Sequence, residues 1–202
     1  IGKVTQDGKM TTYPLATVGS VPIYVRLGGN GTMWATELVG NAIARITSDG
    51  TVTEFPIPTR NSRPIAIVPE PGSKAMWFSE EAGNRIARIT PDGKITEYQL
   101  PMTQANVILA GLAFDRDGHL WVQQYVDQNA PTPANPSPSG SDFIIKIDRS
   151  IITTAPEDMH RVPITYYRVP STQTVMHRIL QGPDGNIWFT ELGVNKVGKL
   201  IR

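Results

Sequence analysis

The sequence predicts an all-β fold, a β-propeller built from four-stranded antiparallel blades. Three observations predict it: tryptophans recur about every 43 residues, short runs of β-branched and aromatic residues surround them, and Asp-Gly, Gly-Asn and Pro-Gly pairs separate the runs. Four short strands in roughly 42 residues is the length of a propeller blade. A single four-stranded sheet cannot bury both of its faces, whereas neighbouring blades cover one another.

The tryptophans mark the second strand of each unit. They lie in four similar segments, MWATE (33–37), MWFSE (76–80), LWVQQ (120–124) and IWFTE (187–191). The first three tryptophans are 43 and 44 residues apart, and the last interval is 67 residues. We therefore expect that interval to carry about two dozen inserted residues relative to the repeat.

The remaining strands keep the same phase. The first strand of a unit is apolar, as in PIAIVP (64–69), and the third mixes basic and apolar residues, as in IARI (86–89). An Asp-Gly turn such as Asp92-Gly93 tolerates the positive φ angles of a tight hairpin and leads to the last strand, as in ITEYQL (95–100). We expect one propeller domain with five blade positions: a partial blade at 1–15, blades at about 20–58, 62–101 and 107–170, and a partial blade at 176–202.

Two segments interrupt the period. Residues 126–142 are rich in proline, serine and asparagine, and we expect a flexible loop between the second and third strands of their unit. Residues 149–163 lie between the third and fourth strands and are also expected to be irregular. In an up-and-down blade, only the first insertion borders the face on which Glu191 lies.

The composition narrows the class of partner. The formal net charge is +1, which gives no electrostatic argument for binding nucleic acid or an anionic membrane. No apolar run is long enough for a transmembrane helix, and the absence of cysteine excludes disulfides and thiolate metal sites but leaves the compartment open. We expect a monomer whose ligand is a small molecule or a cyclic peptide.

Several segments together resemble the streptogramin B lyase (virginiamycin B lyase) family. They are GPDGNIWFTELGVNKVGKL (182–200), ITPDGKITEYQLP (89–101) and SRPIAI (62–67). The resemblance covers nearly the whole chain apart from the two insertions. It implies a seven-bladed propeller of which this chain is a part, and a magnesium-dependent carbon–oxygen lyase that opens cyclic depsipeptide antibiotics at an ester by elimination.

The resemblance also implies roles for particular residues. His177 matches the histidine that removes the proton α to the carbonyl, and Glu191 matches a ligand of Mg²⁺, which polarises that carbonyl. The second metal glutamate of the family falls on Val175, which cannot coordinate a metal. In an alternative alignment, His177 matches a substrate-binding histidine of the preceding blade, and the catalytic blade would lie beyond Arg202.

Other polar residues have a functional and a structural interpretation. Arg178, beside His177, and Gln124, which stands where other units have glutamate, are candidate substrate-binding residues. Glutamates at the ends of second strands, such as Glu37 and Glu80, are expected to accept hydrogen bonds from the next turn or to pair with a basic residue. A calcium site would need acidic residues at EF-hand spacing, which the chain lacks, so these residues are expected in solvated turns: Asp115, Asp117, Asp127 and Asp142. His119 and His160 are likewise expected to be solvated.

Three functions therefore stay open at this level. The first is a lyase of the kind described above, with His177 and Glu191 at its centre. The second is a non-catalytic propeller that binds a small molecule, a glycan or a protein on its central face, as the missing metal glutamate and the insertion 126–142 suggest. The third is a lactonase-type hydrolase, which the absence of an acidic cluster disfavours.

Overall fold

The computed structural model describes residues 1–128 and 140–202, and every sheet in these ranges is antiparallel. A hairpin comes first, made of β1 (Gly2–Val4) and β2 (Met10–Thr12). The first blade contains β3 (Pro22–Leu27), β4 (Met33–Glu37), β5 (Ala42–Ile46) and β6 (Val52–Pro56). The second contains β7 (Pro64–Pro69), β8 (Met76–Glu80), β9 (Arg85–Ile89) and β10 (Ile95–Gln99).

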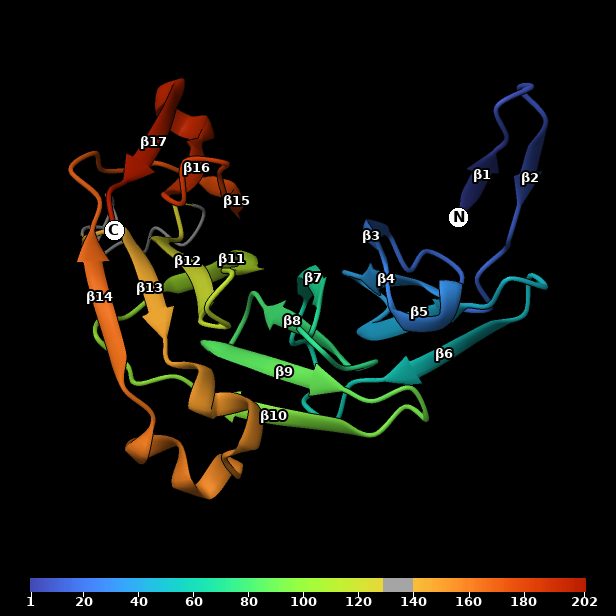
Figure 1. The fold of residues 1–202 in the computed structure, drawn as a ribbon, viewed down its shortest axis with the longest axis horizontal. Helices are drawn as coiled ribbons and strands as arrows, with labels where there is room; N and C mark the ends of the chain where they lie inside the picture. Colours follow the sequence, from blue (N-terminus) through green and yellow to red (C-terminus); the bar gives the residue numbers. More distant parts are fainter. Residues whose placement is uncertain (129–139) are drawn as a thin grey trace, which may run out of the picture.

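The third blade contains β11 (Val107–Phe114), β12 (Leu120–Val126), β13 (Phe143–Ile147) and β14 (Ile164–Arg168). The fourth has three strands, β15 (Met176–Gln181), β16 (Ile187–Glu191) and β17 (Lys196–Leu200). The blades follow one another around a common centre in chain order, and the successive inner strands β3, β7, β11 and β15 pack side by side (Figure 1). The predicted all-β propeller architecture with four-stranded antiparallel blades is confirmed.

The tryptophans pack between blades and are each tied to the turn before their strand. The side chains of Trp34, Trp77 and Trp121 are almost completely buried, and Trp77 meets Phe114 of the next blade edge to face with ring centroids 6.4 Å apart. The indole nitrogen of each tryptophan donates to a side-chain oxygen a few residues earlier: Trp34 to Thr32 (3.0 Å), Trp77 to Glu70 (2.6 Å), Trp121 to Asp115 (2.8 Å) and Trp188 to Asp184 (3.0 Å). The repeat therefore conserves a polar contact as well as apolar packing.

A repeated contact joins the first blade to the second, and the second to the third, through an irregularity in the inner strand. The pairing register shifts near the start of β7, β11 and β15, which indicates a β-bulge in each. A hydroxyl from the preceding blade donates to a carbonyl in the bulge: Thr36 to Ile65 (2.6 Å) and Ser79 to Ala110 (2.5 Å). We call this contact the bulge latch, and it fixes where each inner strand enters the centre.

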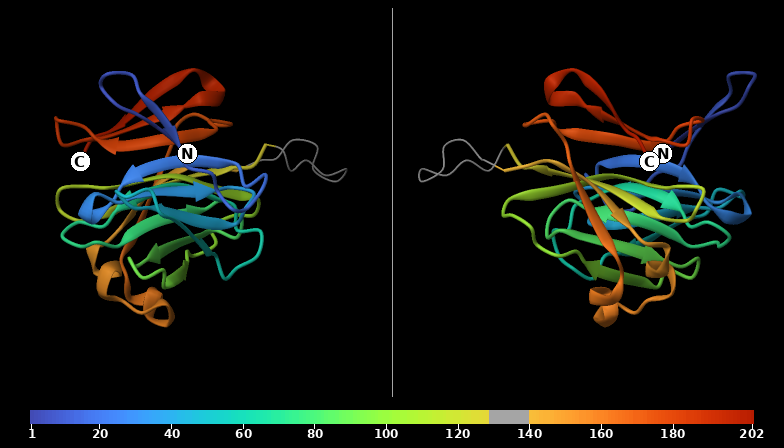
Figure 2. Two further views of the ribbon diagram at one scale, coloured as in Figure 1. Left: turned by 90° about the vertical axis from the view of Figure 1, so that its right-hand side faces the viewer. Right: turned by 60° about the vertical axis from the view of Figure 1, so that its left-hand side comes forward.

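The second insertion has regular structure, in contrast to the expected irregular loop. Residues 149–163 contain two 3₁₀-helices, η2 (Arg149–Thr153) and η3 (Pro156–Arg161), which bury Ile151 and Met159 in the main core. They project from the end of the molecule opposite the hairpin and the fourth blade (Figure 2). Of the first insertion, residues 129–139 lie outside the described residues. Two further 3₁₀-helices are η1 (Gly29–Gly31) and η4 (Leu192–Val194).

No helix within the described ranges has the length and apolar character needed to span a bilayer.

Candidate functional site

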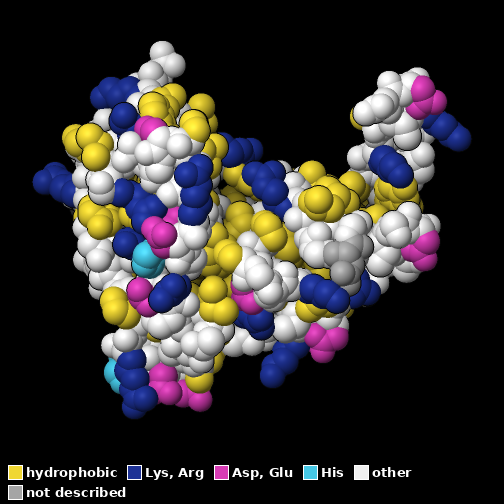
Figure 3. Space-filling model, in the orientation of Figure 1, with side chains coloured by type: hydrophobic (Ala, Val, Ile, Leu, Met, Phe, Trp, Pro, Cys, Tyr) yellow, Lys and Arg dark blue, Asp and Glu magenta, His cyan; other side chains and the backbone are white. Residues whose placement is uncertain are grey.

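The structure brings His177, Arg178 and Glu191 together around one pocket of about 460 Å³. His177 and Arg178 form the bulge at the start of β15, and Glu191 ends β16 directly opposite Met176. The pocket is lined by His177, Arg178, Thr190, Glu191, Leu192, Asn195, Lys196 and Val197. In the space-filling view the surface is hollowed between the fourth blade and the first blade with its hairpin (Figure 3).

The environment of His177 favours the neutral imidazole. Its side chain is half-buried, and burial lowers the pKa of His177, since desolvation disfavours the charged ring. The Arg178 guanidinium lowers this pKa further, and Glu81 opposes the shift. A ring that is unprotonated at neutral pH can accept a proton, as a general base must.

Glu191 offers a free acceptor at the edge of the pocket. The residue is only 5% exposed, and its Oε2 has no hydrogen-bond partner among the described residues. A buried carboxylate oxygen without a partner is costly, so it favours a bound cation or a donor from a ligand. Because Mg²⁺ keeps several waters and needs only one or two carboxylates from the protein, the geometry of Glu191 is compatible with it.

Val175 occupies the place where a second carboxylate would be needed, and its backbone is strained. Its φ is 46°, in the left-handed region that β-branched residues rarely adopt. Its carbonyl accepts the amide of Leu192 at 3.3 Å, so the strained residue is fixed next to Glu191. The site therefore has one carboxylate where the family pattern has two.

The two candidate substrate-binding residues lie in different environments. Arg178 is exposed, and its guanidinium lies 4.2 Å from the centre of the Tyr24 ring. Gln124 is completely buried outside the pocket lining; its amide donates to Asn84 at 2.9 Å and accepts from Thr103 at 3.3 Å. A ligand contact by Gln124 stays a prediction, and the described geometry gives its side chain a structural role.

The glutamates that end the earlier second strands are enclosed. Glu37 and Glu80 are fully buried, and neither carboxylate has a hydrogen-bonded partner among the described residues, whereas Glu80 interacts electrostatically with Arg85, a basic residue on the third strand as expected. Burial raises the pKa of Glu80 to about 8, and the neighbouring Glu97 adds to the shift. Burial raises the pKa of Glu37 as well, with a contribution from Glu54. These carboxyls are therefore held in their protonated form over a wider pH range than an exposed glutamate.

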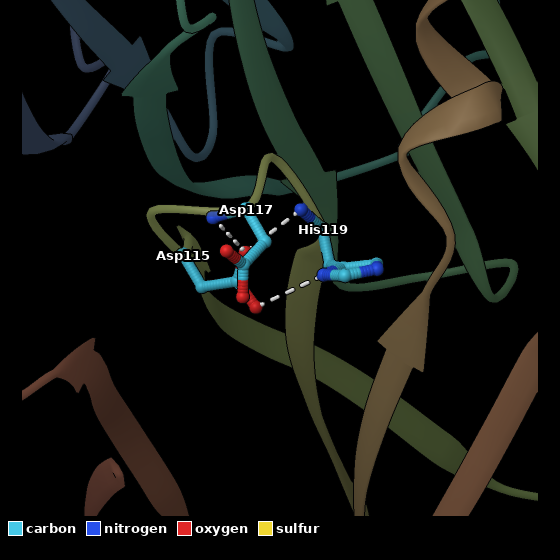
Figure 4. A group of neighbouring side chains, drawn as sticks. All are labelled: Asp115, Asp117 and His119. Atoms are coloured by element: carbon cyan, nitrogen blue, oxygen red, sulfur yellow. Dashed lines mark hydrogen bonds and ion pairs between the residues drawn. The ribbon is translucent and has the colours of Figure 1, made fainter. Parts of the chain in front are cut away.

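Asp115, Asp117 and His119 form a compact group in the turn before β12 (Figure 4); Asp117 is exposed, as expected for a solvated turn, whereas Asp115 is buried. Their possible ligand atoms lie within 4.8 Å of one another, so the group could hold a metal ion. However, Asp115 is buried and already accepts hydrogen bonds from the indole of Trp121 and the backbone of His119. Burial alone would raise the pKa of Asp115, but these bonds outweigh it and leave the pKa below its usual value. Arg202 also pairs with Asp115 at 3.3 Å. Contacts with other protein groups therefore explain the position of Asp115 without a metal ion.

Asp142 is also buried, contrary to the expectation of a solvated turn. Its carboxylate accepts the amide of Val126 at 2.9 Å and both the amide and the hydroxyl of Thr174, at 3.0 and 2.7 Å. It thus ties the end of the first insertion to the segment that leads into β15. Residues that the sequence reasoning did not single out include Thr190, Asn195 and Lys196 in the pocket and Tyr24 behind it.

The fold is that of a β-propeller, and its candidate pocket contains a histidine and a carboxylate, His177 and Glu191. The Virginiamycin B lyase family model matches residues 1–131, and the chain belongs to that family. The His177–Glu191 pocket lies outside the matched residues. A search of curated protein sequences found no match.

Solved structures extend the similarity over the whole chain. The chain is 30% identical to virginiamycin B lyase from Staphylococcus aureus, with a TM-score of 0.62, over 100% of this chain and 73% of that one. A catalytically inactive form of the S. aureus lyase, crystallised with quinupristin, is also 30% identical, with a TM-score of 0.61 over 99% and 73% of the two chains. A putative 6-phosphogluconolactonase from Bacteroides fragilis shares the fold at 13% identity, with a TM-score of 0.57 over 98% and 62%.

Proposed function

We propose that this protein is a carbon–oxygen lyase that opens a cyclic depsipeptide at an ester bond by elimination. The observation that supports the proposal is that His177 and Glu191 line one pocket, with a neutral imidazole and a carboxylate oxygen that has no partner. Membership of the virginiamycin B lyase family, and a relative that is crystallised with the streptogramin ligand quinupristin, support the substrate class.

In the proposed reaction, the Nδ1 or Nε2 atom of His177 removes the proton α to the ester-bearing residue's carbonyl. The electrons of the broken C–H bond form a carbon–carbon double bond, and the adjacent C–O bond breaks with its electron pair on the departing carboxylate. No water is consumed, so the open-chain product is an isomer of the substrate. Arg178 and Lys196 line the same pocket and are placed to bind the carboxylate that forms.

We propose Glu191 as the protein ligand for Mg²⁺. When bound, the ion would polarise the carbonyl next to the carbon that loses its proton, which stabilises the negative charge that develops on the oxygen. Glu191 would hold the ion through Oε2, the atom without a hydrogen-bond partner.

We further propose that the blade boundaries follow the repeat, at 1–15, 20–58, 62–101, 107–170 and 176–202, and that the intact protein is seven-bladed. The chain spans 73% of the S. aureus lyase structure, which supports a ring with more blades than these residues supply. The bounds of the strands are compatible with this division.

The test is incubation of the purified protein with a streptogramin B and Mg²⁺, followed by chromatography and mass spectrometry. We expect an open-chain product of unchanged mass, and His177→Ala should lower kcat/KM about 10²- to 10⁴-fold, as expected for a lost general base. His160→Ala, a change on the surface of η3, should leave the rate unchanged. An unchanged substrate would reject the proposal, and a product that has gained one water would indicate hydrolysis.

A second candidate is a non-catalytic propeller that binds a small molecule, a glycan or a protein at the same face. Val175 favours it, because the valine leaves the proposed metal site with one carboxylate. Specific binding that survives EDTA, together with an absence of turnover, would support this candidate over the lyase.

A further inference from the structure

The bulge that carries His177 departs from the latch seen in the earlier blades. The latch carbonyls of Ile65 and Ala110 correspond to the carbonyl of His177. Each belongs to the residue that follows the partner of Glu80, Gln124 or Glu191 on the neighbouring strand. In the earlier blades, a serine or threonine of the preceding blade donates to this carbonyl. In the third blade the equivalent donor is Gln123, and its longer side chain donates one residue further on, to the carbonyl of Arg178 at 3.0 Å.

The carbonyl of His177 is instead bonded by a residue from the first blade. The hydroxyl of Tyr24 on β3 donates to it at 3.0 Å, across 153 residues of sequence. Tyr24 is 8% exposed, and burial raises its pKa even though Arg178 and Arg26 oppose the shift, so the hydroxyl remains a donor at neutral pH. At the carbonyl of His177, the contact from the preceding blade is therefore replaced by a contact from the first blade, which carries Tyr24.

Three neighbours make room for this arrangement and hold it. A side chain at Gly111 would meet the carbonyl of His177 at 2.9 Å and the amide of Gln123 at 2.3 Å, so glycine is required there. The amide of Arg178 donates to the hydroxyl of Thr190 at 3.1 Å, and the Arg178 guanidinium lies over the Tyr24 ring. The backbone on both sides of the imidazole is thus fixed by groups from three blades.

We infer that Tyr24 is a positioning residue for His177: its hydroxyl holds the bulge carbonyl, so that the imidazole faces the pocket beside Glu191. This inference rests on the proposed function, since positioning matters for catalysis only if His177 is the base. A base that is misplaced by a fraction of a bond length loses rate even though its chemistry is intact. Catalysis by His177 then depends on contact between the first and fourth blades.

The test uses Tyr24→Phe, which removes the hydroxyl and keeps the ring under Arg178. The histidine ring signals are followed by NMR against pH in the full chain, with the His177 signal assigned by His177→Ala. We expect the pKa of His177 to rise toward its ordinary value, because the loosened bulge exposes the ring to water. If the parent chain has lyase activity, kcat should fall about tenfold with little change in KM.

The matched control is Tyr98→Phe, which removes a similar hydroxyl bond to a backbone carbonyl, that of Thr154 at 3.3 Å, away from the pocket. It should leave the His177 titration as it is in the parent chain. An unchanged His177 titration in Tyr24→Phe would overturn the inference. Because the titration is read without substrate, a parent chain that shows no turnover would reject the proposed lyase and leave this test of Tyr24 intact.

Discussion

The second and third blades have different buried polar residues at the same position of the repeat. The second strand of each carries the fully buried side chain, Glu80 in one blade and Gln124 in the other. The Gln124 amide is bonded to Asn84 and Thr103, whereas the Glu80 carboxylate has no hydrogen-bond partner in the described structure and lies next to Glu97. A neutral amide satisfies the site at every pH, but a carboxyl satisfies it only while it is protonated.

The fourth blade shows a third outcome at this position. Glu191 borders a pocket of about 460 Å³ that also contains His177. The same residue type at the same point of the repeat is therefore enclosed in one blade and available to a ligand in another. Repetition explains why a glutamate is present, and only the surroundings decide what it can do.

The largest effect is expected when Gln124 of the third blade is replaced by glutamate, the residue at this position in the second blade. Gln124→Glu places a carboxylate against the Asn84 side-chain oxygen and removes the amide that donates to it. We expect a loss of about 3 kcal/mol in the free energy of unfolding at about pH 8, because a charge is buried and the Asn84 oxygen loses its donor. Urea unfolding at about pH 5 and about pH 8 measures it. Equal stability of the variant and the parent at both pH values would show that the amide contacts contribute nothing.

The reverse exchange tests the second blade. The pKa of Glu80 is raised to about 8 in the folded protein from an ordinary value of 4.5, so the folded state binds more protons between these values. The contribution of Glu80 to the free energy of unfolding should therefore be highest at low pH. It should fall as pH rises through this window, by at most about 1.4 kcal/mol per pH unit. Glu80→Gln mimics the protonated side chain, so it should not show this loss and should be more stable than the parent at about pH 8.

The control for Glu80→Gln is Glu157→Gln, at an exposed position on η3. It should leave the pH dependence of unfolding unchanged. If the parent and Glu80→Gln have parallel stability curves between about pH 5 and about pH 8, the enclosed carboxyl is not titrating in that window.

A smaller effect is expected from restoring a second carboxylate to the fourth blade. Val175→Glu places an acidic side chain next to Glu191 and relieves a β-branched residue at a φ of 46°. We expect the affinity for Mg²⁺ to rise about tenfold, equivalent to about 1.4 kcal/mol, in isothermal titration calorimetry. Val175→Gln is the uncharged control. An affinity for Mg²⁺ that does not change, or that rises equally in both variants, would argue against a metal site at this position.

The smallest effect concerns the hydroxyls that hold the bulges. Ser79 in the second blade accepts from Ala66 at 3.1 Å in a fully buried setting, whereas Thr190 in the fourth accepts from the exposed amide of Arg178. Thr190→Val should cost less than about 1 kcal/mol of unfolding free energy, because water can replace the lost partner. A larger loss in thermal or urea unfolding would mean that this bulge is more tightly coupled to the core than its exposure indicates.

Much of the fold could be predicted because each blade is a local unit. The tryptophan spacing, the Asp-Gly turns and the alternating strands predicted antiparallel blades, and these are present in the structure. The segment 149–163 was not predicted as ordered, because its two 3₁₀-helices are stabilised by burying Ile151 and Met159 in a core that other blades supply. Short 3₁₀ segments have no periodic pattern that a sequence can show.

The sequence by itself determined the repeat, the strand order within a blade and the identity of His177 and Glu191 as candidates, since these follow from spacing and from resemblance. Only the tertiary structure decided which glutamate is enclosed, that Asp115 and Asp142 are buried, and that Tyr24 reaches the carbonyl of His177. The physical reason is that burial depends on packing against other blades, and a contact such as the one between Tyr24 and His177 spans 153 residues, so neither leaves a local signal at the residue itself.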